Sequence, residues 1–295
     1  MKTIPMEFPT DWTEYELLDS GGGEKLEHFG GYTLVRPDPR AIWQKNLSET
    51  AWNSADSTYR RTDPKTGTWT TQQPPPSPWK VTYHEMTFGL RPTEFKHVGV
   101  FPEQAVNWNW IQQQINGKPL NILNLFAYTG GATMAAAGAG AKVTHLDAVK
   151  PTITWAHENT KESKLDNKPI RWIEDDAYKF VSREAKRGNT YDGIIMDPPR
   201  FGRGSKGEVW KLEDDLPKLL NLCKQILSPK PAFVLINAYT ADISSIVLFN
   251  MLGGLMKDTS GNTTHGELAL KESKSERFLP NGIFARWSSI SELQQ

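Results

Sequence analysis

The residues with the most specific chemistry are Asp197-Pro198-Pro199-Arg200-Phe201, which directly follow the apolar run GIIM. Two prolines in succession end a strand and hold an extended, stiff segment at its tip, because proline fixes its own φ and has no N–H to donate. Asp197 and the neighbouring carbonyls then form a rim of hydrogen-bond acceptors. Such a rim suits a flat, amine-bearing ring on which Phe201 stacks. The alternative is a purely structural turn at the end of a strand.

A glycine turn lies at the end of an earlier apolar run. The segment Phe126-Ala-Tyr128-Thr129-Gly130-Gly131 leads into an Ala-rich helix. The two glycines permit a tight turn and a close backbone approach, and the start of the helix offers free N–H groups to a carboxylate or phosphate. The segment is not G-x-G-x-x-G, which counts against a dinucleotide site. A turn that binds no ligand is the alternative.

Acidic residues end the next two apolar runs. Asp147 follows Gly130 by 17 residues, close to the ~20-residue spacing of an acid that accepts ribose hydroxyls. Asp175 and Asp176 follow the run IRWIE, and either one is placed to cap the helix that begins at Ala177. A carboxylate in that position either reads an adenine edge or caps the helix, and the two roles are compatible.

Basic residues follow the two prolines. Arg200, Arg203, Lys206 and Lys211 are interleaved with glycines, which predicts either a loop that clamps a phosphate backbone or an ordinary flexible surface loop. Asn237, at the end of the last apolar run before residue 240, either helps to hold a base or caps a turn.

Five strand-helix units in succession after Asn121 would bring these segments together. Repeated strand-helix units predict a parallel sheet covered on both faces, with ligands at the carboxyl ends of its strands. ELALKES and GIFARWS near the end of the chain read as an antiparallel hairpin. We therefore expect an α/β, Rossmann-like fold with seven strands, mostly parallel, ending in a β-hairpin. This arrangement fits class I methyltransferases better than dehydrogenases.

The first part of the chain follows a different pattern, with short β-type runs separated by proline-rich and glycine-rich turns. The expected strands are 15–18, 31–35, 79–88 and 94–100. Residues 1–95 therefore form a smaller β-rich domain, with substrate recognition as a possible role, and residues 96–295 the second domain. The tryptophans of this region either stack on bases or fill a small core, and we favour the core.

Composition limits the function further. The chain has 34 Lys and Arg against 34 Asp and Glu, so its net charge does not itself indicate a nucleic-acid partner. The single cysteine, Cys223, excludes a disulfide framework. The six histidines show no metal-ligand spacing, and no apolar run approaches the ~18 residues that span a bilayer. We expect a cytoplasmic protein that binds neither a metal nor a membrane.

With these residues in place, the chain resembles the class I S-adenosylmethionine-dependent methyltransferases, and within them the bacterial 23S ribosomal RNA enzymes that make 5-methylcytosine or 7-methylguanine. The resemblance covers residues 90–290 and rests on FPEQAVNW (101–108), LNLFAYTGGAT (123–133), HLDAVKPTITWAHEN (145–159), EDDAYKF (174–180) and DPPRF (197–201).

The resemblance implies a role for several residues. Phe126, Tyr128, Thr129 and Gly130 would hold the methionine part of S-adenosyl-L-methionine, Asp147 the ribose and Asp176 the adenine. Asp197 and Pro198 would face the methyl group and the target base, and Phe101 and Gln104 would also touch the cofactor. The implied substrate is RNA, most directly ribosomal RNA.

One departure from the family concerns the mechanism. The 5-methylcytosine enzymes need a cysteine near the end of the fifth strand, because carbon 5 becomes nucleophilic only after a thiolate adds to carbon 6. Here that strand reads FVLINAYT, and Cys223 lies on the apolar stripe of the preceding helix. We therefore expect direct methyl transfer to a base nitrogen. Methylation of a protein or small molecule, a nicotinamide-dependent oxidoreductase and a non-catalytic RNA-binding protein remain as alternatives.

Overall fold

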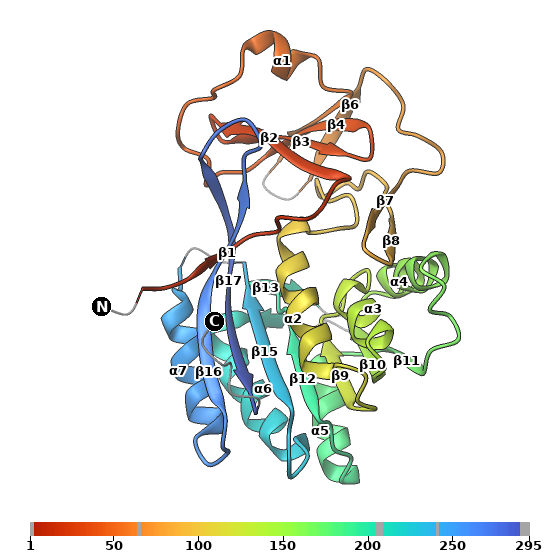
Figure 1. Ribbon diagram of the computed structural model, residues 1–295, viewed down its shortest axis with the longest axis vertical. Coiled ribbons are helices and arrows are strands. Elements are labelled where there is room, and N and C mark those ends of the chain that lie inside the picture. The colour runs from red at the N-terminus through yellow and green to blue at the C-terminus, as the bar shows by residue number, and fades with distance from the viewer. Residues whose placement is uncertain (1–2, 64–65, 204–208, 240–241, 290–295) are drawn as a thin grey trace. The chain divides into compact units, whose positions relative to one another are not determined.

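The computed structural model describes residues 3–63, 66–203, 209–239 and 242–289. The chain divides into two compact units. The α/β unit comprises Met1–Glu7, Val106–Leu268 and Gly282–Gln295, and the β-rich unit comprises Phe8–Ala105 and Ala269–Asn281 (Figure 1). Both units are therefore built from segments that are distant in sequence.

The α/β unit is organised around one sheet. Its strands are β1 (Met6–Glu7), β9 (Asn121–Leu125), β10 (Lys142–Asp147), β11 (Ile170–Glu174), β12 (Gly193–Met196), β15 (Phe233–Ala238), β16 (Asn262–Lys271) and β17 (Phe278–Ser288). They lie in the order β1-β16-β17-β15-β12-β9-β10-β11. The strands from β15 to β11 are parallel, and β17 runs antiparallel to β15. The expected α/β fold and terminal hairpin are confirmed.

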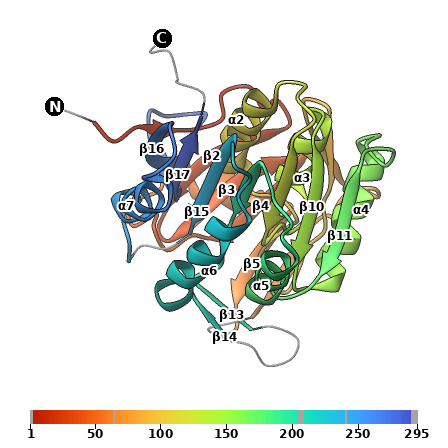
Figure 2. The ribbon, with the colours of Figure 1, turned by 90° about the horizontal axis from the view of Figure 1, so that it is seen from below.

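Helices cover both faces of this sheet. They are α2 (Ala105–Ile115), α3 (Gly131–Gly138), α4 (Lys150–Glu162), α5 (Ala177–Arg187), α6 (Leu212–Ile226) and α7 (Ser245–Met256). Neighbouring residues of a strand point to opposite faces. Ile122 therefore packs with α2 and α3, whereas Leu123 packs with α5, α6 and α7. Figure 2 shows the sheet between these two helical layers. The sheet has eight strands rather than seven, because two-residue β1 pairs with β16 and is too short to leave a sequence pattern.

The β-rich unit contains two sheets. Its elements are β2 (Tyr15–Gly21), β3 (Glu24–Phe29), β4 (Tyr32–Pro37), α1 (Glu49–Asn53), β5 (Ser57–Arg61), β6 (Gly67–Thr71), β7 (Lys80–Tyr83), β8 (Met86–Gly89) and the 3-10 helix η1 (Pro102–Gln104). Strands β2 to β6 form one sheet in chain order, and β7 and β8 form a hairpin. Trp12, Trp52 and Trp79 are buried, which confirms the expected core role for these three.

The strand expected over residues 94–100 is wrong. Lys96 has a φ of 66°, in the left-handed region, which an extended strand does not contain. The N–H of Thr93 donates to the carbonyl of His97 at 3.2 Å, and the N–H of Arg91 donates to the carbonyl of Val98 at 3.1 Å. These residues therefore form a tight turn. The run expected over 79–88 is interrupted in the same way, because His84 has a φ of 50° between β7 and β8.

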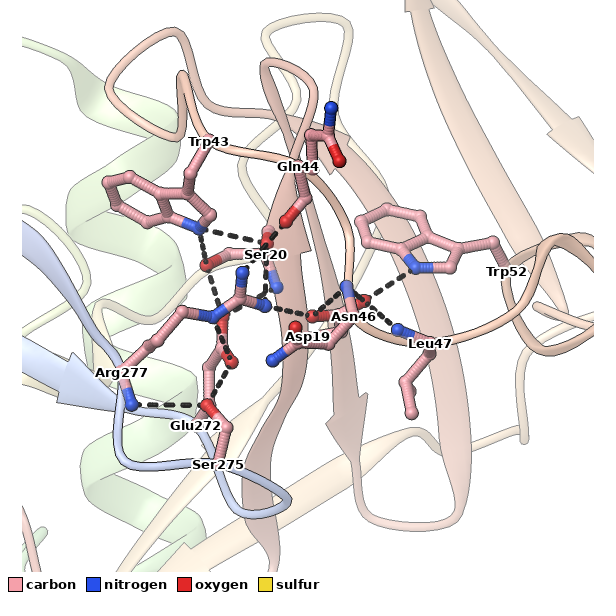
Figure 3. A network of polar contacts seen from close by, with 10 residues as sticks. All are labelled: Asp19, Ser20, Trp43, Gln44, Asn46, Leu47, Trp52, Glu272, Ser275 and Arg277. Carbon is pink, nitrogen blue, oxygen red and sulfur yellow. Dashed lines mark hydrogen bonds and ion pairs between the residues drawn. The ribbon is translucent and has the colours of Figure 1, made fainter.

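A network of buried charges joins distant segments of the β-rich unit (Figure 3). Asp19 on β2 accepts hydrogen bonds from the N–H of Leu47 at 2.8 Å and from Trp52 Nε1 at 2.9 Å. Arg277 lies between two buried carboxylates, donating to Asp19 at 2.6 Å and to Glu272 at 2.9 Å. The turn between β16 and β17 is therefore fastened to β2 and to the segment before α1.

Replacing Arg277 with alanine should destabilise this unit by about 3 kcal/mol, because Asp19 and Glu272 would keep their burial and lose their shared cation. Lys274→Ala on the same turn is the control. Lys274 is 64% exposed in its side chain and lies 4.0 Å from Glu16, so its loss should cost less than ~0.5 kcal/mol. Denaturant unfolding of both variants measures the difference. Equal effects would show that the network does not stabilise the unit.

Candidate active site

The five parallel strands β9, β10, β11, β12 and β15 end at one edge of the sheet. At this edge the backbone that follows β9 adopts the left-handed conformation at several residues. Phe126 and Tyr128 have φ values of 58° and 49°, and Gly130 has a φ of 90°. Left-handed backbone at a residue with a side chain costs about 1 kcal/mol or more and needs support from its surroundings. Part of that support is a hydrogen bond from the N–H of Tyr128 to Asp147 Oδ2, at 2.9 Å.

Asp147 therefore connects the tips of β9 and β10. Its other oxygen accepts a hydrogen bond from the N–H of Val149 at 2.9 Å. Burial raises the pKa of the Asp147 carboxyl, and the hydrogen bonds from Tyr128 and Val149 oppose that shift. A half-buried carboxylate held by backbone donors is a suitable acceptor for the hydroxyls of a ribose.

The glycine turn lies close against two helices. A Cβ on Gly130 would be 3.1 Å from the Cβ of Ala156 on α4, and a Cβ on Gly131 would be 2.5 Å from the ring of Trp108 on α2. Thr129 is buried, and its carbonyl accepts a hydrogen bond from Asn159 Nδ2 at 3.0 Å. The start of α3 is thus held by its packing, with first-turn N–H groups that no intrahelical bond uses.

Asp176 lies at the tip of β11. It is the N-cap of α5, and its side chain accepts a hydrogen bond from the N–H of Lys179 at 2.9 Å. The N–H of Asp175 donates to the carbonyl of Asp147 at 3.1 Å. The capping role considered from the sequence is therefore present, and the tips of β10 and β11 are joined directly.

The segment Asp197-Pro198-Pro199 continues from β12, beside the tip of β9. The N–H of Asp197 lies 3.4 Å from the carbonyl oxygen of Leu125, the last residue of β9. Pro198 is buried and Pro199 exposed. The chain then forms a second, small sheet of β13 (Phe201–Arg203) and β14 (Val209–Lys211). Phe201 is 53% exposed.

Trp210 is a residue that the sequence reasoning missed. Its indole Nε1 donates to the carbonyl of Pro199 at 2.7 Å, and its ring centre lies 5.1 Å from that of Phe126. One side chain thus contacts both the proline segment and the glycine-turn segment. A tryptophan one residue before the basic Lys211 was the only signal in the sequence, and nothing local shows which carbonyl it reaches.

Asn237, at the tip of β15, is 2% exposed and belongs to a buried polar chain. Asn107 on α2 donates to Asn237 Oδ1 at 2.9 Å, and Arg286 on β17 donates through Nε to Asn107 Oδ1 at 3.0 Å. Arg286 also pairs with Glu7 at 2.9 Å. The sequence reasoning missed Asn107 and Arg286; an arginine within the apolar strand GIFARWS was the available signal.

The predicted basic segment has acidic neighbours. Arg200 forms ion pairs with Asp242 and, at 3.6 Å, with Glu213. The Lys211 side chain is 59% exposed and lies 3.9 Å from Asp214. Lys206 and the side chain of Arg203 lie outside the described residues. Each of the two described cations therefore has a carboxylate partner.

Two predicted cofactor residues belong to the β-rich unit rather than to the unit that carries the strand tips. Phe101 precedes η1, and Gln104 ends it. The Phe101 ring lies 5.0 Å from the ring of His97, and Gln104 is 7% exposed.

Cys223 is fully buried in the apolar cluster between the sheet and α6. Burial raises the pKa of its thiol to about 12. The expected core position of Cys223 is confirmed, and a thiol of this kind is not a nucleophile.

Within the described residues, no group of three or more His, Cys, Asp or Glu side chains is placed to hold a metal ion. A helix long and apolar enough to cross a membrane is likewise absent from residues 3–63, 66–203, 209–239 and 242–289.

The sheet order, the antiparallel β17 beside β15, the glycine turn after β9 and the acid at the tip of β10 define a class I methyltransferase fold. The chain belongs to the S-adenosylmethionine-dependent methyltransferase family, whose model matches residues 48–248. It is an enzyme of that family, and its cofactor is S-adenosyl-L-methionine.

Known structures and curated proteins agree with this assignment. The crystal structure of the SAM-dependent methyltransferase from Agrobacterium tumefaciens is 39% identical, with a TM-score of 0.92 over 97% of this chain and 94% of that chain. SMU.776, crystallised with SAH, shares the fold at 19% identity and a TM-score of 0.73, over 94% of this chain and 76% of that one. The ribosomal RNA large subunit methyltransferases K/L of Hahella chejuensis and Pseudoalteromonas atlantica are 32% and 33% identical over 50% and 48% of this chain. The chain spans about a fifth (20%) of the length of these two curated relatives.

Trp210→Phe should lower kcat about tenfold and leave the Kd for S-adenosyl-L-methionine nearly unchanged, because it keeps an aromatic ring near Phe126 but removes the hydrogen bond that holds the Pro199 carbonyl. Turnover at saturating acceptor and calorimetric cofactor binding measure the two effects. Val209→Ala, an exposed position on the same strand, is the control and should leave both unchanged. A Trp210→Phe enzyme with full turnover would rule out this positioning role.

Proposed function

We propose that this enzyme methylates RNA, with ribosomal RNA as the first candidate. The support is the activity for which the curated relatives are named, and these relatives match about half of the chain at 32–33% identity. The matched residues make up only 20% of the length of these relatives. The RNA substrate therefore needs its own test.

One observation supports the proposed chemistry. The proline segment and the glycine turn lie at neighbouring strand tips, and Trp210 contacts both of them. When bound, S-adenosyl-L-methionine supplies an electrophilic methyl group on a sulfonium. A nitrogen lone pair of the base forms the new C–N bond as the C–S bond breaks, and that bonding pair remains on sulfur. An amine nitrogen then loses its proton to water, whereas a ring nitrogen keeps the positive charge.

The enzyme's contribution is then positioning and electrostatics. Asp197 and the carbonyls beside it accept hydrogen bonds from the base, and Pro198 and Pro199 keep that rim rigid. Phe201 stacks on the base, and Asn237 helps to orient it. No thiolate takes part, because the thiol of Cys223 is buried.

We assign the cofactor contacts by the family resemblance and the geometry of the strand tips. The methionine part lies at Phe126, Tyr128, Thr129 and Gly130, the ribose at Asp147 and the adenine at Asp176, with further contacts from Asp197, Phe101 and Gln104. The donors and acceptors at the tips of β9 and β10 fit an amino-acid carboxylate and a ribose.

We also propose that residues 1–95 recognise the substrate and that residues 96–295 form the methyltransferase domain. Arg200, Arg203, Lys206 and Lys211 are the proposed phosphate contacts. The pairing of Arg200 with Asp242 and Glu213 is the specific observation in favour of the alternative, methylation of a protein or small molecule.

Transfer of labelled methyl groups from S-adenosyl-L-methionine into total RNA from a strain lacking the gene tests the proposal. Wild-type enzyme should label RNA, and Asp197→Ala should reduce the rate about 10²- to 10³-fold, because the base loses a fixed hydrogen-bond acceptor. Digestion to nucleosides then identifies the modified base and atom. Asp258→Ala is the matched control, because Asp258 is an exposed aspartate that follows α7. This variant should label RNA at the wild-type rate.

Calorimetric binding of the cofactor separates two kinds of failure. If RNA stays unlabelled while S-adenosyl-L-methionine binds, the acceptor is a protein or a small molecule, and labelling of those pools should be measured next. An Asp197→Ala enzyme with the wild-type rate would remove the proposed role of that carboxylate.

Cys223→Ala should keep its methyl-transfer rate within about twofold and lose about 1 kcal/mol of stability through the small cavity it leaves. The same labelling assay and denaturant unfolding measure these effects. Abolished transfer in a folded Cys223→Ala protein, or a 5-methylcytosine product, would contradict direct transfer to nitrogen.

A further inference from the structure

The β-rich unit holds a cluster of charged side chains on one face of its larger sheet and in the adjoining turns. Its cations are Lys25, Arg36, Arg40 and Lys96, which we call the cationic cluster, and its carboxylates are Glu27, Asp38 and Glu103. Lys25 and Arg36 are only 8% and 3% exposed. Cations buried to this degree are normally balanced by carboxylates.

One carboxylate is shared by the two cations on the strands. Lys25 on β3 lies directly opposite Arg36 on β4, an arrangement that is unfavourable for like charges. Glu27 accepts two hydrogen bonds from Arg36, at 2.7 and 2.8 Å, and pairs with Lys25 at 3.0 Å. It also accepts a hydrogen bond from the hydroxyl of Tyr15 at 3.0 Å. Its two oxygens thus contact four donor atoms from three residues, two of which are cations.

The second carboxylate is occupied by Arg40. Asp38 accepts hydrogen bonds from Arg40 Nε at 2.8 Å and from Nη2 at 2.7 Å. The third, Glu103, is 3% exposed, and burial raises the pKa of its carboxyl. Its hydrogen-bond partner is Asn281, at 3.3 Å. Burial therefore makes Glu103 harder to ionise than an exposed glutamate, while Lys25 and Arg40 oppose that shift in its pKa.

Lys96 is the cation left over. Its Nζ donates to the carbonyl of Pro37 at 3.0 Å, and among the described residues no carboxylate lies within ion-pair distance of it. Burial and the positive charge of Lys25 lower the pKa of Lys96 to about 8. Its backbone is in the left-handed region, and Arg36 donates to its carbonyl at 3.2 Å. The ammonium group of Lys96 thus lies among other cations. This position is unfavourable because of charge repulsion and because the backbone of Lys96 is in the left-handed region.

We propose that the cationic cluster binds a phosphate group of the methyl acceptor, with the ammonium groups of Lys96 and Lys25 as its main donors. This inference rests on the proposed RNA substrate and deepens it. A phosphate would supply the negative charge that the cluster lacks and accept the N–H groups of Lys96 that Pro37 does not use. Lys96 and its neighbour His97 are partly exposed, which leaves a route for the ligand.

His97 links the cluster to the predicted cofactor segment. Burial and the surrounding cations lower the pKa of His97 to about 3, so that its ring is neutral. The ring lies 5.0 Å from that of Phe101. A phosphate bound at Lys96 would therefore lie near the chain segment to which the family resemblance assigns a cofactor contact.

Calorimetric titration of the 295-residue chain with inorganic phosphate tests the site without any methyl transfer. Lys96→Met keeps most of the side-chain stem and removes the charge, so it should weaken phosphate binding about 10- to 100-fold. Lys274→Met, an exposed lysine of the same unit, is the control and should bind like wild type. Binding by Lys96→Met within twofold of wild type, or no binding by wild type, would overturn the proposal.

Thermal stability separates a binding role from a structural one. Lys96→Met should melt at the same temperature as wild type or higher, because an unpaired buried charge is removed. A lysine whose role is structural would lower the melting temperature when replaced. A large loss of stability, together with unchanged phosphate binding in the folded fraction, would contradict the inference.

The affinity of the cationic cluster for an anion should also depend on pH, because Lys96 loses its proton as the pH rises. The charged groups that face it are Lys25 on β3, Arg36 on β4, and Asp38 and Arg40 after β4. Sulfate keeps its charge between pH 6 and 10, so its binding should weaken as pH rises through about 8, where Lys96 loses its proton. Lys96→Met should show a flat profile. A flat profile for wild type would count against Lys96 as the donor.

Competition against bound phosphate identifies its source. An oligoribonucleotide without terminal phosphates competes if the site takes a backbone phosphodiester, and ribonucleoside 5′-monophosphates compete if it takes a terminal phosphate. Competition only by a dicarboxylate would overturn the phosphate assignment. If phosphate binding depends on Lys96 but RNA is never labelled, the phosphate site is supported and the proposed RNA substrate is rejected.

Discussion

The hydrogen bond from the N–H of Tyr128 to Asp147 is the interaction on which the candidate active site depends. It supports the left-handed backbone at Phe126 and Tyr128 and so sets the direction in which the chain enters α3. It also fixes one oxygen of the carboxylate that is proposed to hold the ribose. The close packing of Gly130 and Gly131 against α4 and α2 leaves the turn little freedom to relax. Cofactor binding can therefore use a backbone shape that folding has already produced.

The proline segment is held in a complementary way. Proline restricts its own backbone, but the orientation of the rim relative to the glycine turn depends on contacts from elsewhere: the N–H of Asp197 near β9 and the indole of Trp210 on the Pro199 carbonyl. Direct transfer to a lone pair needs geometry more than acid-base groups. A site of rigid backbone, strand-tip carboxylates and neighbouring aromatic rings, with the thiol of Cys223 buried, is consistent with that requirement.

The β-rich unit contains two networks of buried charges that differ in how their cations and carboxylates are paired. Around Arg277 each buried carboxylate has a cation and several further donors, which is the arrangement expected of a structural network (Figure 3). Around Lys96 the carboxylates are already occupied by Arg36, Lys25 and Arg40, and one ammonium has only a carbonyl. Two networks in one small unit thus differ in charge balance, and an unbalanced one has a physical reason to take an anion.

The sequence by itself determined the strand-helix series, the terminal hairpin and the identity of the strand-tip residues, because these follow from local periodicity, from glycine and proline restrictions and from motifs confined to a few neighbours. It did not reveal the turn at Lys96, where a β-type pattern lies on left-handed backbone. Only the tertiary structure decided that Trp210 reaches Pro199, that Asn237 is buried behind Asn107, and that Arg277 lies against Asp19, 258 residues away. Those partners are chosen by the packing of distant segments, and no local pattern encodes which charges end up buried together.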